Sequence, residues 1–140
     1  MEDRYLFKAK RTDNGEWVTG SLITCEDGTY KIATSCLEGK ANEPILVCAY
    51  DVDRDTICQC TGLKDKNGKL IWENDIVRDE QGNFYKAFWQ NNYYQFSWVC
   101  VKTDVFLIGT KWDLWSIKSF EIEVIGNIFD NKELLESEEK

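Results

Sequence analysis

Short apolar runs separated by turn residues repeat along most of the 140-residue chain. Alternating apolar and polar positions over about four to eight residues are typical of β-strands. The pattern predicts strands at residues 5–10, 16–25, 29–34, 45–50, 57–61, 71–78, 84–89, 93–101, 105–108 and 122–128. Short strands at such regular intervals indicate an all-β fold, either a small barrel or a sandwich.

Turn residues and one helix complete the predicted elements. Asn14-Gly15 and Asn67-Gly68 lie between predicted strands, and Asn-Gly favours the positive φ angles of a type I′ hairpin turn. A single short C-terminal helix is expected over residues 131–138, where Asp130 is suited to cap the first turn.

The chain length predicts one domain, residues 1–140. The acidic connector 51–55 is the best internal boundary, and it would divide the chain into subdomains 1–50 and 56–140. The charged start is followed by no apolar signal segment. Every apolar run is shorter than the roughly 20 residues of a membrane helix. We therefore expect a cytoplasmic protein without a membrane partner.

The net charge of −8 is concentrated at the C-terminal end. Residues 121–140 carry seven acidic side chains and only two lysines. An acidic protein repels the phosphate backbone, whose attraction to Lys and Arg supplies most non-specific nucleic-acid affinity. The charge therefore disfavours a sequence-independent nucleic-acid binder.

The chain has six cysteines, at positions 25, 36, 48, 58, 60 and 100, and no histidine. In a reducing cytoplasm we expect all six to be free thiols that behave as small buried hydrophobes. The pair Cys58-x-Cys60 lacks the further ligands of a zinc site. No metal site and no cofactor are indicated.

The segment from Gln59 to Val77 reads QCTGLKDKNGKLIWENDIV. It resembles the signature of the YopX family, small proteins of bacteriophages, prophages and other mobile elements. Residues 123–131 (EVIGNIFDN) and the opening segment 4–20 match the same family in the same order. The departures are mild. Cys60 stands where the family pattern has tyrosine, and Trp72 replaces another aromatic residue. Asn74 replaces a glycine, and Asn is the next-best residue for a left-handed backbone position. The resemblance implies an SH3-like small barrel or roll with additional strands, in a host bacterial cell, and it implies no established activity.

Two interpretations of the signature are open. In the first, its turn residues are architectural, and Asp75 accepts backbone N–H groups in its own turn. These residues are Gly62, Asp65, Asn67, Gly68, Glu73 and Asp75, together with Gly126 and Asn127 of the second match. In the second, Asp65, Glu73 and Asp75 form a carboxylate cluster of a hydrolase or a divalent-cation site. The turn interpretation is favoured, and no catalytic residue is assigned.

Eight of the fifteen residues from 84 to 98 are aromatic. Alternate residues of a strand share a face. The even positions Phe84, Phe88, Tyr94, Phe96 and Trp98 are expected in the core, with Tyr85, Trp89 and Tyr93 on the opposite face. Together with Trp112, the second set predicts either a packing or subunit surface, or an exposed platform for a partner peptide or a stacked base.

The sequence thus favours a non-enzymatic phage or prophage accessory protein that acts through contacts with a host or phage protein and forms a homo-oligomer. An alternative is a single-stranded nucleic-acid-binding module that uses Tyr85, Trp89 and Tyr93 together with Lys86. The net charge opposes this alternative.

Overall fold

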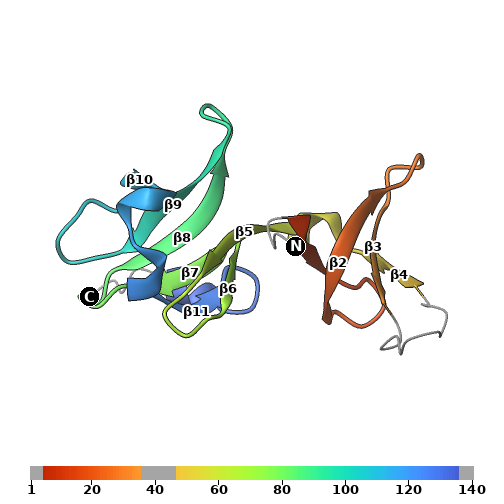
Figure 1. Cartoon of the computed structure of the whole chain (residues 1–140), viewed down its shortest axis with the longest axis horizontal. Helices are drawn as coiled ribbons and strands as arrows, with labels where there is room; N and C mark the ends of the chain where they lie inside the picture. Colours follow the sequence, from red (N-terminus) through yellow and green to blue (C-terminus); the bar gives the residue numbers. More distant parts are fainter. Residues whose placement is uncertain (1–4, 36–46, 136–140) are drawn as a thin grey trace. The chain divides into compact units, whose positions relative to one another are not determined.

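The computed structural model describes residues 5–35 and 47–135 (Figure 1). The chain divides into two compact units, residues 1–60 and 61–140. The expected all-β class is confirmed, because the strands form antiparallel sheets and the described helical segments are single 3₁₀ turns. No closed barrel is present in the described part of the chain.

The strands are β1 (Phe7–Lys10), β2 (Trp17–Thr24), β3 (Tyr30–Ser35), β4 (Val47–Val52), β5 (Cys58–Lys64), β6 (Leu70–Trp72), β7 (Asp75–Arg78), β8 (Phe84–Gln90), β9 (Gln95–Lys102), β10 (Lys111–Asp113) and β11 (Glu123–Asn127). The 3₁₀ turns are η2 (Arg54–Thr56), η3 (Leu114–Ser116), η4 (Ser119–Glu121) and η5 (Lys132–Leu135).

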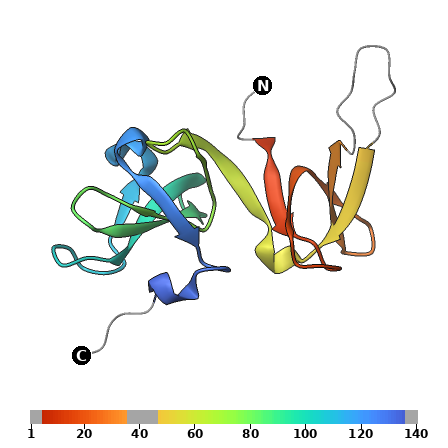
Figure 2. The ribbon, with the colours of Figure 1, turned by 90° about the horizontal axis from the view of Figure 1, so that it is seen from below.

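The N-terminal unit is a curved antiparallel sheet in the order β4-β3-β2-β1, with the first residues of β5 paired to β1 (Figure 2). Its core consists of Ala9, Ile32 and Val52, against which partly buried side chains such as Leu22 and Ile57 pack. The connector expected at 51–55 lies inside this unit. Its first two residues end β4, and η2 follows.

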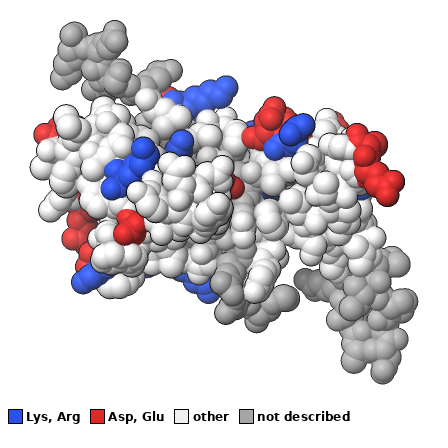
Figure 3. Space-filling view, turned by 90° about the horizontal axis from the view of Figure 1, so that it is seen from above, with Lys and Arg blue, Asp and Glu red and all other residues white. Residues whose placement is uncertain are grey.

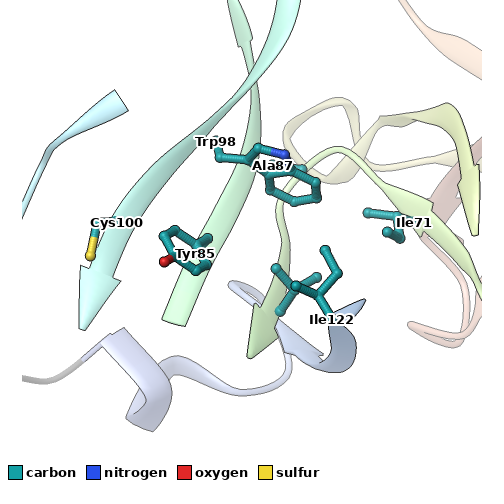
Figure 4. Packing of buried hydrophobic residues seen from close by; sticks show 7 residues of the cluster. Ile71, Tyr85, Ala87, Trp98, Cys100 and Ile122 are labelled. Atoms are coloured by element: carbon teal, nitrogen blue, oxygen red, sulfur yellow. The ribbon is translucent and has the colours of Figure 1, made fainter. Parts of the chain in front are cut away.

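The C-terminal unit contains a five-stranded sheet in the order β10-β9-β8-β7-β11 and the hairpin of β5 with β6. The β8–β9 hairpin is long and its tip projects beyond the neighbouring strands (Figure 1). Seven buried residues form the core: Ile71, Val77, Tyr85, Ala87, Trp98, Cys100 and Ile122. In Figure 4 the Trp98 ring of β9 lies beside Ala87 of β8, and Ile122 reaches the core from the turn before β11.

Two predicted elements are wrong, and one observed strand is absent from the prediction. The expected C-terminal helix is only the 3₁₀ turn η5 within the described residues, and residues 136–138 of that prediction lie outside them. Residues 105–108, predicted as a strand, form a loop, and the short strand β10 that follows was not predicted. Cys100 at the end of β9 bonds to the backbone of Gly109 and Thr110, so the pairing with β9 begins only after the apolar run 105–108, which is left in the loop.

The Asn-Gly turns exist, but they are not of type I′. In both, the glycine has a positive φ, 72° at Gly15 and 79° at Gly68, while neither asparagine does. Longer hairpin loops commonly combine a type I turn with one left-handed residue, which explains the difference.

The expectation of six free thiols is also wrong, because Cys48 is disulfide-bonded. Cys25, Cys58, Cys60 and Cys100 are free, and Cys36 lies outside the described residues. Burial raises the pKa of the Cys100 thiol.

Candidate functional site

Asp65 organises the turn between β5 and β6. Its Oδ1 accepts the backbone N–H groups of Asn67 and Lys69, each at 2.9 Å, and its Oδ2 accepts the N–H of Val124 at 2.9 Å. Burial alone would raise the pKa of Asp65, but these three hydrogen bonds and the charge of Lys69 outweigh it, so the pKa lies below its ordinary value. The carboxylate thus attaches the signature hairpin to β11, which belongs to the second matching segment.

Asp75 closes the turn between β6 and β7. It is buried, and its Oδ2 accepts the N–H of Trp72 at 2.8 Å. Between them, Asn74 has a φ of 71°, in the left-handed region where Asn is tolerated. The N–H of Asn74 donates to Ala87 O at 2.7 Å, and its carbonyl accepts the N–H of Ile128 at 3.1 Å. This turn therefore joins strands that are far apart in the sequence.

The remaining signature residues complete these turns. Gly62 has a φ of 84° within β5, and half-buried Glu73 lies in the turn beside Asn74. Among the described residues, no group of three or more Cys, Asp or Glu side chains is arranged to hold a metal ion. The three signature carboxylates are therefore not gathered at one point.

Gly126 and Asn127 form a third anchored turn. The Asn127 Oδ1 accepts the N–H groups of Phe129 and Asp130 at 2.9 and 2.8 Å. A Cβ atom at Gly126 would lie 2.5 Å from Oδ1 of Asn131, so any other residue here would have to displace the Asn131 side chain. The sheet bulges immediately before this glycine, so Gly126 permits the close approach of the C-terminal segment.

The core-facing residues of β8 and β9 do not all have even sequence numbers. Ala87 lies opposite Trp98 and Tyr85 opposite Cys100, so odd positions of β8 share a face with even positions of β9. That common face is the core face. The sequence-based prediction carried one parity through the turn, and it therefore placed the β8 residues on the wrong face.

Tyr85 is consequently buried in the core, so of the two alternatives for this residue the exposed platform is wrong. Its hydroxyl donates to Asp79 Oδ2 at 2.9 Å, and burial together with this carboxylate raises its pKa. The ring of Trp112 meets Tyr85 edge-on at 5.4 Å and meets Phe106 at 5.2 Å. Trp112 is thus half-buried in a row of three rings.

The exposed rings gather instead at the tip of the β8–β9 hairpin, and we call Trp89, Tyr93 and Tyr94 the aromatic tip. Their exposed fractions are 40%, 67% and 81%. Trp89 packs edge-on against Phe96 at 5.2 Å and donates to Asn91 Oδ1 at 2.9 Å. Tyr94, which the sequence placed in the core, has a φ of 51° in the turn.

A chain of polar side chains supports the aromatic tip on the other face of the hairpin. The Ser97 hydroxyl, fully buried, donates to Gln90 Oε1 at 2.9 Å. The Gln95 Nε2 donates to Ser97 Oγ at 3.2 Å and to Asp113 Oδ1 at 2.6 Å. Satisfied networks of this kind rigidify the strands that carry them, so the tip is held against β10.

Sequence reasoning missed the exposure of the loop between β9 and β10. Its backbone is held by Thr103 Oγ1, which accepts the N–H groups of Val105 and Phe106 at 3.0 and 3.2 Å. Leu107 in this loop is 83% exposed and Trp115 after β10 is 82% exposed. The sequence signal for this loop was the apolar run 105–108, which does not alternate with polar residues and lies between Asp104 and Gly109.

The charges do not form a nucleic-acid groove on the face shown in Figure 3, where residues of both signs are scattered among uncharged ones. Lys86, which was expected to assist the rings, is at an even position of β8, opposite in face to Tyr85 and Trp89. A shallow hollow of about 220 Å³ beside Tyr85 is lined by Asp79, Glu80 and Glu121 among others. Its acidic lining is unsuited to phosphate.

No described helix is long and apolar enough to cross a membrane. No curated protein matches the chain. Among solved structures, the chain is similar to the crystal structure of protein EF1440 from Enterococcus faecalis, with 25% sequence identity and a TM-score of 0.55, over 93% of this chain and 96% of that one. The model of the family described as YopX protein matches residues 6–136. The chain therefore belongs to the YopX protein family.

Proposed function

We propose that this protein is a non-enzymatic accessory protein of a phage or integrated element that acts in the host cytoplasm through protein–protein contacts. It contacts a host or phage partner and also self-associates. In this proposal the C-terminal unit serves as an SH3-like module, since its strands β7 to β10 form a meander and β11 returns beside β7. The match to the YopX family over residues 6–136 supports this setting only through what the family resemblance of the sequence implies.

One observation carries the proposal: Tyr94 is the most exposed ring of the aromatic tip and has a backbone conformation that side chains rarely adopt. Folding alone favours glycine at such a position. A strained and exposed tyrosine on a rigid hairpin is accounted for by an external contact, because Tyr and Trp contribute most to protein interfaces. Its neighbours Trp89 and Tyr93 enlarge the same surface.

The carboxylates of the signature support the non-enzymatic part of the proposal. Asp65 and Asp75 accept backbone N–H groups in tight turns. A general base must reach a proton of its substrate, and these oxygens are directed at the protein's own backbone. We therefore propose that they are architectural.

The test is affinity purification of the tagged protein from infected or lysogenic cells, with mass spectrometry of co-eluting proteins. A specific partner that is retained by wild type and lost from Trp89→Ala and Tyr94→Gly supports the proposal. The matched control is Asn74→Gly, which changes the other left-handed side-chain position but lies in the signature turn. Equal recovery of the partner by all variants would remove the aromatic tip from the proposal.

A further inference from the structure

We infer that two copies of this chain associate through β10, by continuing the five-stranded sheet of the C-terminal unit across a twofold axis. The inference rests on the self-association in the proposed function and names the surface responsible. β10 is an edge strand: β9 lies on one side, and no described strand pairs with the other. Open sheet edges are templates for pairing with another chain.

Backbone polar groups of β10 are directed at this open edge. The N–H of Cys100 donates to the carbonyl of Thr110 at 2.8 Å and the Cys100 carbonyl accepts the N–H of Gly109 at 2.8 Å, so a two-residue bulge takes the place of the hydrogen-bonded pair next to Lys111. Hydrogen-bonded and non-hydrogen-bonded pairs alternate along an antiparallel ladder. Lys111, opposite Val99, and Asp113 are then in non-hydrogen-bonded positions. The N–H and C=O of Lys111 and the N–H of Asp113 therefore point away from β9.

The side chains of β10 are self-complementary. If two β10 strands pair antiparallel about Trp112, Lys111 of each copy lies opposite Asp113 of the other. Both side chains line one hollow on the outer face of the sheet, and Gln95 holds the Asp113 carboxylate there by its 2.6 Å hydrogen bond. Opposite charges directly across a strand pair are stabilising, and the twofold axis provides this pair twice.

Exposed apolar side chains flank β10 at both ends, with Leu107 and Ile108 before it and Trp115 after it. Antiparallel pairing places the beginning of one β10 beside the end of the other. The loop of one copy therefore approaches Trp115 of the second copy. A stable interface buries about 800 Å² on each partner, which is more than a three-residue ladder provides. These flanking side chains supply the remaining apolar area.

Charge reversal followed by mixing tests the pairing register. Lys111→Glu and Asp113→Lys each place like charges opposite one another at both ends of the pair, and each is expected to weaken dimerisation about ten-fold or more. An equimolar mixture of the two variants restores opposite charges at both contacts. We expect wild type and the mixture to sediment as dimers at a concentration where each variant alone is monomeric.

Thermal melts of each variant identify any loss of folding, which is a concern at Asp113 because it bonds Gln95. Trp115→Ser, at an exposed position, gives an independent test and is expected to weaken the dimer without lowering the melting temperature. A wild-type dimer that Lys111→Glu and Trp115→Ser leave unchanged overturns the β10 inference but leaves the proposed self-association intact. A wild-type protein that stays monomeric overturns both the β10 inference and the proposed self-association. A dimer that forms only after Lys111→Ala overturns both as well, because the lysine would then protect the sheet edge against pairing. The affinity purification described above tests the proposed contact with a different protein, independently of these dimerisation experiments.

Discussion

The two units are built on cores of different size. The core cluster of the N-terminal unit consists of Ala9, Ile32 and Val52, whereas that of the C-terminal unit contains seven buried residues, including the fully buried Trp98. Apolar burial is the main favourable contribution to folding. The C-terminal unit therefore gains more folding free energy from apolar burial, and this free energy can hold strained turns and exposed rings in fixed positions.

The two units also differ in how far their aromatic side chains are exposed. In the N-terminal unit, cations lie over the rings: Lys8 is 4.7 Å from the centre of Trp17, and Arg11 is 4.1 Å from that of Tyr50. In the C-terminal unit, Tyr93, Tyr94 and Trp115 are largely exposed. The N-terminal unit thus covers Trp17 and Tyr50 with cations, although Tyr5 is exposed, whereas the C-terminal unit leaves more of its large aromatic side chains exposed.

The largest effect is expected from Trp98→Ala. The ring is fully buried and its Nε1 donates to Leu114 O at 3.2 Å. Its removal leaves a cavity at the centre of the larger core and lowers the free energy of unfolding by about 3–5 kcal/mol. Amide exchange measured residue by residue should accelerate within residues 61–140. Unchanged protection of β8 and β9 would contradict the assignment of the core.

Ile32→Ala probes the smaller core. Ile32 is fully buried between few apolar neighbours, and the substitution is expected to cost about 2–5 kcal/mol. Because the core cluster formed by the described residues of this unit has only two other buried members, we expect exchange protection of β1 to β4 to be lost at a lower denaturant concentration than in wild type. If protection of these strands were retained, the N-terminal unit would draw its stability from elsewhere.

Asp65→Asn should cost about 1–3 kcal/mol at neutral pH, because a charged acceptor of three backbone N–H groups is replaced by a neutral amide. The folded-state pKa of Asp65 is lowered. Its contribution to stability is therefore complete above the unfolded pKa of about 3.9 and disappears as the pH falls through the folded value.

Denaturant unfolding at a series of pH values measures this contribution. The difference between wild type and Asp65→Asn should be largest near pH 7 and should shrink under acid. A difference that stays constant down to pH ~2, below the ordinary aspartate range, would show that the charge of Asp65 is unimportant.

The smallest effect on stability is expected from Tyr94→Gly. Relief of the left-handed conformation favours the variant, while the greater freedom of glycine in the unfolded chain opposes it, so the free energy of unfolding should change by less than about 1 kcal/mol. Thermal unfolding checks this value. A large loss of stability would show that Tyr94 serves folding and would remove the argument that its position reflects an external contact.

The turns of the signature were accessible to sequence reasoning because their chemistry is local. Gly68 and Asn74 have left-handed backbones that only a few residue types tolerate, and Asp65 bonds to amides two and four residues away. The third bond of Asp65, to Val124, joins residues 59 positions apart. No local sequence pattern predicts a hydrogen bond between residues so far apart.

The faces of the aromatic strands could not be predicted from alternation alone. Alternation fixes which residues of one strand share a face. The length of the turn decides whether the odd or the even residues of the next strand lie on that same face of the sheet. Here Gln90 pairs with Gln95, and this register places Tyr85 inside and leaves Tyr94 in the turn. A turn one residue longer or shorter would have reversed the assignment for β9.

The amino-acid sequence by itself determined the all-β class, most strand positions, the anchored turns and the family, because each depends on local backbone preferences or on a contiguous motif. Tertiary structure decided which rings are buried, where Asp65 finds its third hydrogen bond, and that a short charged strand lies at an open edge. Those features depend on hairpin register and on contacts between distant segments, which no stretch of sequence specifies alone.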